Sequence, residues 1–72
     1  MSLQMLSDGQ CVETSHISKV EVFEEALNLL VTLKNGRMVG VHGDGVHKDA
    51  ALLENIRDKE SLTYVVHRKR RV

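Results

Sequence analysis

The sequence has no proline and no tryptophan, a single cysteine, and only two aromatic residues, Phe23 and Tyr64. Because a lone cysteine has no partner within the chain, Cys11 excludes an internal disulfide. The scarcity of rings means that aliphatic side chains must form the core, and it leaves little material for stacking on nucleic-acid bases. No apolar run approaches the roughly twenty residues that span a bilayer, which excludes an integral membrane protein. The first residues do not resemble a secretory signal, so we expect a cytoplasmic protein.

The 72 residues are electrically balanced, with ten acidic and ten basic side chains and a formal net charge of zero. A neutral chain is not expected to have a general affinity for nucleic acid. Hydrophobic residues make up 42% of the chain and charged residues 28%, which is typical of a globular domain. A domain of this size is near the lower limit at which a core sustains itself. We therefore expect a protein partner or a homo-oligomer.

The clearest structural signal is an Asn-Gly pair, at positions 35 and 36, between two segments in which apolar and polar residues alternate. This pattern predicts a β-hairpin over residues 27–41. A two-residue turn would mix apolar and polar side chains on both faces, whereas a three-residue loop with Gly36 in the left-handed conformation aligns the apolar ones. The second register pairs Leu33 with Arg37, Val31 with Val39, and Leu29 with Val41. We predict that the last two pairs form a buried face.

The opposite face of this hairpin is mixed, and its apolar members are Leu30 and Met38, with Thr32 between them in the expected pairing. Apolar residues that gather on a surface are typical of a site that binds another protein. We therefore predict Leu30, Met38 and Thr32 as partner-binding residues.

Residues 1–10 contain the turn signal Ser7-Asp8-Gly9 but no sustained hydrophobic period, so we expect a flexible N-terminal arm. β-Branched and apolar residues predict a strand over residues 11–23, broken near residues 15 and 16, and a turn over residues 24–26. An alternative is a short helix over residues 20–27, because Ser18 to Glu21 fits a helix capping box.

Residues 42–45 predict a loop, and Asp44 is suited to cap a helix that follows. Apolar residues then recur at spacings of four, three and three, on one helical stripe that should pack on the hairpin. They are Val46, Ala50, Leu53 and Ile56. Residues 62–67 return to strand-like composition and lead into a basic tail at 68–72. We predict one α+β domain over residues 11–67, a small antiparallel sheet of three or four strands with one helix packed on one face, in the order β-β-β-α-β.

The densest polar cluster lies between residues 42 and 49, and it contains four candidate ligands for zinc or manganese. These are His42, Asp44, His47 and Asp49. Their spacing matches no strong metal signature, and a glycine loop that leads into a helix is the simpler interpretation. A metal-dependent enzyme on this loop is our third hypothesis. We expect no cofactor and no catalysis, because so small a domain has little room for both a core and a water-excluding pocket.

Four of the ten basic residues are adjacent, at Arg68, Lys69, Arg70 and Arg71. Such a tail can neutralise phosphates of RNA or DNA, contact an acidic protein surface, or keep the chain solvated. The segment 29–40 resembles the first motif of Sm-like RNA-binding proteins, with a strand, an Asn-Gly turn and a strand that contains Gly40, and residues 64–66 are similar to their last strand. In that family the glycine lies one residue farther from the turn, and the Asp and Asn that contact RNA have no clear counterparts here.

The leading hypothesis is a small, non-catalytic interaction module, a regulator or accessory factor that binds a protein partner or its own copies. Small size, the lack of a catalytic constellation and the partly apolar second hairpin face support it. The alternative is a nucleic-acid-binding protein that uses the basic tail, in line with the Sm-like resemblance.

Overall fold

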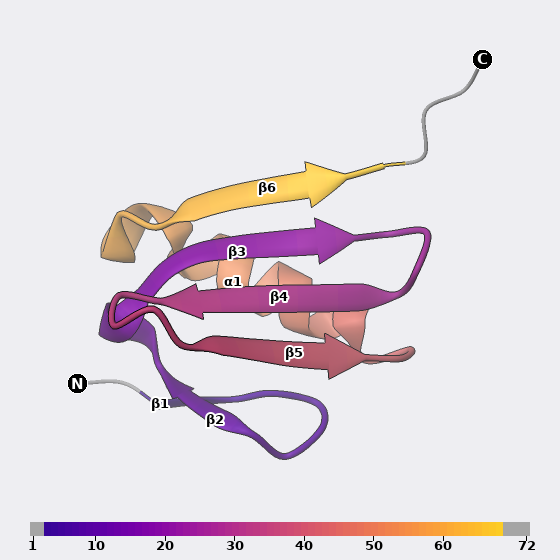
Figure 1. Ribbon diagram of the computed structural model, residues 1–72, viewed down its shortest axis with the longest axis horizontal. Helices are drawn as coiled ribbons and strands as arrows, with labels where there is room; N and C mark the ends of the chain where they lie inside the picture. The colour runs from indigo at the N-terminus through magenta and orange to yellow at the C-terminus, as the bar shows by residue number, and fades with distance from the viewer. Residues whose placement is uncertain (1–2, 69–72) are drawn as a thin grey trace.

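The computed structural model describes residues 3–68, and it has a four-stranded sheet with one helix, α1, packed on one of its faces (Figure 1). A separate two-stranded hairpin precedes this sheet in the chain. The elements are β1 (Leu3–Met5), β2 (Cys11–Glu13), a short 3-10 helix (Thr14–His16), β3 (Ile17–Phe23), β4 (Asn28–Leu33), β5 (Met38–His42), α1 (Val46–Glu60) and β6 (Thr63–His67). The predicted α+β fold, with its helix before the last strand, is confirmed.

The strand order in the sheet is β5-β4-β3-β6, and one of the three pairings is parallel. β3 with β4 and β4 with β5 are antiparallel, but β6 runs parallel to β3, so the expectation of an all-antiparallel sheet is wrong. The helix is the reason. It starts at the end where β5 finishes and returns the chain behind β4 and β3, so β6 begins at the same end as β5 and runs in its direction (Figure 1).

The β4–β5 hairpin has the predicted register and the predicted bulge. Its pairs include Leu29 with Val41 and Val31 with Val39. Leu33 N–H donates to the Arg37 carbonyl at 2.7 Å, which closes a three-residue loop. Gly36 in this loop has a φ of 91°, a conformation that costs a residue with a side chain. The Asn35 side chain accepts Arg37 N–H at 2.9 Å, so the Asn-Gly pair determines the loop through both of its residues.

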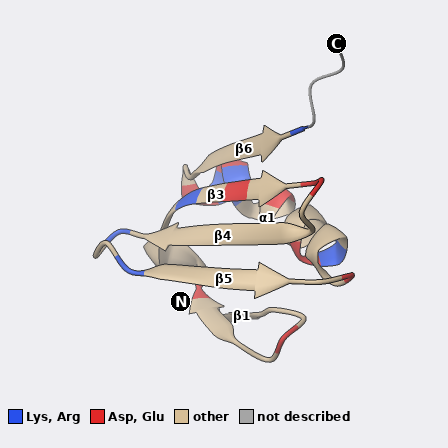
Figure 2. Cartoon of the chain, turned by 45° about the vertical axis from the view of Figure 1, so that its right-hand side comes forward, with Lys and Arg blue, Asp and Glu red and all other residues tan. Residues whose placement is uncertain are grey.

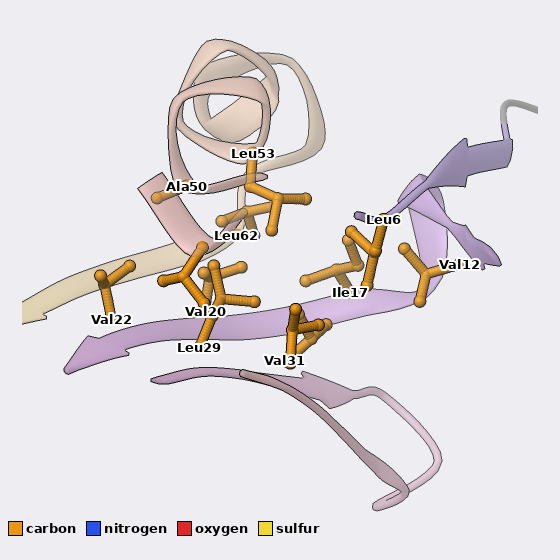
Figure 3. Packing of buried hydrophobic residues seen from close by; sticks show 12 residues of the cluster. Leu6, Val12, Ile17, Val20, Val22, Leu29, Val31, Ala50, Leu53 and Leu62 are labelled. Atoms are coloured by element: carbon orange, nitrogen blue, oxygen red, sulfur yellow. The ribbon is translucent and has the colours of Figure 1, made fainter. Parts of the chain in front are cut away.

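The core lies between the sheet and α1 (Figure 3). The helix contributes the predicted stripe: Val46 and Leu53 are fully buried, Ala50 is buried, and Ile56 packs at the margin. The sheet contributes Ile17, Val20, Val22, Leu29, Val31 and Val41. Each buried Val, Leu or Ile side chain contributes about 1.5–3 kcal/mol, so this layer is the main source of stability.

Tyr64 of β6 packs at the edge of this core with its ring half-buried. Its hydroxyl donates to the Ala50 carbonyl in α1 at 3.4 Å. Burial raises the pKa of the Tyr64 phenol above its ordinary value, and the nearby Glu54 carboxylate acts in the same direction. Folding therefore favours the neutral form of the Tyr64 phenol.

The segment expected to be a flexible arm over residues 1–10 is, from residue 3 onward, part of the folded structure. β1 pairs with β2, and Leu6 between them is 2% exposed and joins the core. Ser7 attaches this hairpin to α1, because its N–H donates to the two carboxylate oxygens of Asp49 at 3.1 and 2.9 Å and its hydroxyl donates at 2.8 Å. Asp49 is 2% exposed, and a carboxylate so buried needs such donors.

Helix α1 begins without the predicted Asp44 cap. Gly45 is the N-cap residue, and no side chain caps the helix. A Cβ at Gly45 would overlap Ser7 Oγ, so the start of the helix and the N-terminal hairpin are in close contact here. The acidic side chain in the first turn is Asp49, and it accepts hydrogen bonds from Ser7 of the N-terminal hairpin.

The segment before β4 matches the strand interpretation. The predicted break near residues 15 and 16 is the short 3-10 helix, and the predicted turn spans residues 24–27. The alternative helix over residues 20–27 is wrong, because Val20 and Val22 alternate with polar residues and bury one face of β3. Leu27 ends the turn with a φ of 51°.

Candidate functional site

One face of the four-stranded sheet is turned away from α1, and we call it the open face (Figure 1). Alternation along the strands and their register place twelve residues on it. They are Met38, Gly40 and His42 of β5, Asn28, Leu30 and Thr32 of β4, Lys19, Glu21 and Phe23 of β3, and Thr63, Val65 and His67 of β6. Figure 2 shows that Lys, Arg, Asp and Glu interrupt only β3 among these strands.

The three predicted partner-binding residues lie together on the open face. Thr32 is paired with Met38, and Leu30 is the next outward residue along β4. Met38 is 57% exposed, one of the large apolar side chains most open to solvent in the described chain, and Leu30 and Thr32 are half-buried. This part of the open face is therefore uncharged, mainly apolar and partly accessible.

Gly40 is paired with Leu30 on the open face, and because it has no side chain the surface is hollowed at this point. It has no positive φ, and a Cβ at this position would meet no atom within 4 Å, so the fold does not require glycine here. A hollow of about 170 Å³ lies at this point, bordered by Phe23, Leu30, Gly40 and His42 among others. Glycine inside a strand often marks a close approach of another backbone or a ligand.

A second group of residues on the open face joins β3 to β6. Glu21 accepts from His67 Nε2 at 3.0 Å and forms an ion pair with Lys19 at 3.6 Å. The Phe23 and His67 rings stack with centroids 4.5 Å apart and planes 7° apart. A shallow hollow of about 450 Å³ adjoins this stack and is lined by Phe23, His67 and Arg68, with residues 25 and 26.

Sequence reasoning missed this second group. Glu21 and His67 are 46 positions apart, and they meet only because β6 lies parallel to β3. The one signal was the strand-like composition of both segments, which does not say which strands are neighbours. The group places polar side chains on the β3 and β6 side of the open face.

The structure does not bring the four metal-ligand candidates together. His42 is exposed on the open face, where Asn28, with its amide nitrogen turned toward it, donates to His42 Nδ1. Asp44 and His47 are exposed in the loop and the first helical turn, and Asp49 is buried under the N-terminal hairpin. Within residues 3–68, no three His, Cys, Asp or Glu side chains are grouped so as to hold a metal ion.

Only the first residue of the basic tail lies within the described residues. Arg68 is 74% exposed at its side chain, and its Nε lies 3.5 Å from a carboxylate oxygen of Glu24. The other three predicted nucleic-acid-binding residues, Lys69, Arg70 and Arg71, lie outside the described residues. Arg68 thus already has an acidic neighbour.

No protein-family model matches the chain, and no curated protein does so either. Between residues 3 and 68 there is no helix with the length and apolar character needed to cross a membrane. A function must therefore be inferred from the chemistry of the surface.

Proposed function

We propose that this protein is a small non-catalytic interaction module that binds a protein partner through its open face. The observation that supports the proposal is an uncovered sheet face on which Leu30, Thr32 and the exposed Met38 form an uncharged patch around Gly40. Within residues 3–68, helix α1 covers only the other face. Patches of this kind, with polar residues at the margin, are typical of protein-binding surfaces.

The distribution of charge on the open face favours a protein as the partner. Glu21 contacts both Lys19 and His67, so β3 presents a compensated pair of charges instead of a basic strip. A nucleic-acid surface would need an excess of cations to displace counterions from phosphates. A mainly apolar patch with compensated polar groups matches another protein chain better.

The test begins with affinity capture from the source cell, with and without nuclease, and continues with the captured protein and the purified chain. We expect Leu30→Glu to weaken binding at least tenfold, because it places a carboxylate in the apolar patch. Since this change also adds a charge beside Glu21, Met38→Glu at a more exposed position is the second variant. Ala51→Glu, which makes the same change on the exposed side of α1, is the matched control and should bind as the unmodified chain does.

Binding that is equal in all three variants would overturn the proposal. Capture that disappears after nuclease treatment, falls steeply with salt, and is lost when residues 68–71 are neutralised would instead favour the nucleic-acid alternative. Thermal unfolding of each variant separates a loss of binding from a loss of fold.

A further inference from the structure

Strand β6 forms one edge of the sheet, and among residues 3–68 it pairs only with β3 (Figure 1). Glu24 N–H donates to the His67 carbonyl at 3.2 Å. In a parallel pair, every second residue of a strand directs both its N–H and its C=O group toward the neighbouring strand. Because the His67 carbonyl bonds to β3, the residues that face β3 are Thr63, Val65 and His67. Tyr64 and Val66 direct their N–H and C=O groups outward. An edge of this kind is a template for another strand.

The two edges of the sheet differ. At the β5 edge, Gln10 Nε2 from the N-terminal hairpin donates to the Gly40 carbonyl at 3.2 Å, and this hairpin lies alongside β5 (Figures 1 and 2). Residues 63–66 at the β6 edge contain no charge, proline or register shift, which are the features that usually block an edge. The described chain therefore has one partly covered edge and one open edge, which favours a closed pair of molecules over an open-ended array.

We propose that two copies of this chain pair through β6 in an antiparallel arrangement, with the twofold axis at Val65. This register sets Tyr64 of each copy opposite Val66 of the other. Each such pair exchanges both of its N–H to C=O bonds, so all outward backbone groups of Tyr64 and Val66 are used. A register with the twofold axis at Tyr64 would pair Val66 of each copy with Leu62 of the other. The N–H of Leu62 already donates to the Arg57 carbonyl, so it is not available for this pairing.

The same register suits the side chains. Half-buried Tyr64 and Val66, at the margin of the core, cover each other across the interface. On the open face, Val65 meets its own copy and His67 meets Thr63, so no like charges are opposed. Arg68 falls opposite Leu62, beside the carboxyl end of α1, where the helix dipole favours a cation. The pairing would join the two sheets and their open faces into one surface.

Sedimentation of the full chain tests the proposal, which is independent of the protein partner proposed above. We expect a dimer, and we expect Val65→Lys to raise its dissociation constant at least tenfold because two lysines would meet at the axis. In the monomer the new lysine lies opposite Glu21, so the fold should survive. Ala51→Lys, the same kind of change on the exposed side of α1, is the matched control and should leave the dimer intact.

A cysteine cross-link tests the register itself. At a non-hydrogen-bonded antiparallel pair the Cα atoms lie about 4.5 Å apart, which is within the range that a disulfide spans. In a Cys11→Ser background, Val65→Cys should therefore form a covalent dimer on mild oxidation, and Ala51→Cys on the exposed side of α1 should not. A chain that stays monomeric at about 1 mM, or a dimer that Val65→Lys leaves intact, would overturn the proposal.

Discussion

Replacing Asp49 with alanine should destabilise the protein by about 2–4 kcal/mol. The carboxylate accepts from two donors, the N–H and the hydroxyl of Ser7, at 2.8–3.1 Å. A hydrogen bond to a charged group contributes about 1.5–3 kcal/mol. The sum is reduced because Ser7 is exposed and water can take over part of its bonding. Asp49→Asn keeps the volume and one acceptor oxygen, so we expect about half of the loss.

Urea and thermal unfolding of Asp49→Ala, Ser7→Ala and the double variant measure this contact. For a chain of this length 1 kcal/mol corresponds to about 4–8 °C in Tm, so the Asp49→Ala loss should be at least about 8 °C. Ser7→Ala removes only the hydroxyl donor, and the double-mutant cycle should give a coupling of about 1 kcal/mol or more. Hydrogen exchange should show faster exchange in residues 3–13 of Asp49→Ala. Additive losses, or unchanged exchange in that hairpin, would refute the reasoning.

Three further predictions concern the loop, the core and pH. Gly36→Ala should cost about 1–2 kcal/mol because its φ is 91°, whereas Gly40→Ala, with open space around it, should not destabilise the fold; denaturant melts of the two variants decide this. Leu53→Ala at the fully buried centre of α1 should cost about 2–5 kcal/mol in the same assay, and Leu52→Ala, half-buried, clearly less. Because the folded pKa of Tyr64 is raised, its contribution to stability is complete below pH 10 and decreases as pH rises through the folded value. Tyrosinate absorbance should therefore titrate at higher pH in the native chain than in urea, and equal midpoints would contradict the burial of this ring.

The elements that the sequence predicts well are those whose signal is local. The β4–β5 loop follows from Asn35 and Gly36, because only a three-residue bulged loop places the apolar residues of both strands on one face. The stripe on α1 follows from a spacing that is visible within eleven residues. In both cases the residues that specify the structure are neighbours in the chain.

The features that the sequence did not predict depend on contacts between distant segments. Leu3–Met5 is too short for a periodic signal, and its position follows from the burial of Leu6 and from Ser7, which is 42 residues away from Asp49. The parallel pairing of β6 depends on where α1 returns the chain. As a result, the sequence predicts that Leu30, Thr32 and Met38 lie together. It does not predict the contact between Glu21 and His67.

The composition of the open face is consistent with binding that is reversible. A face that is permanently covered would be expected to be as apolar as the core, as the helix side of β4 is with Leu29 and Val31. On the open face, β4 and β5 are uncharged, whereas β3 carries Lys19 and Glu21. These two side chains form an ion pair that is partly exposed to solvent. Such a surface is stable in water by itself and still has apolar area to bury. We therefore expect the partner of the open face to dissociate under native conditions, without unfolding of either chain.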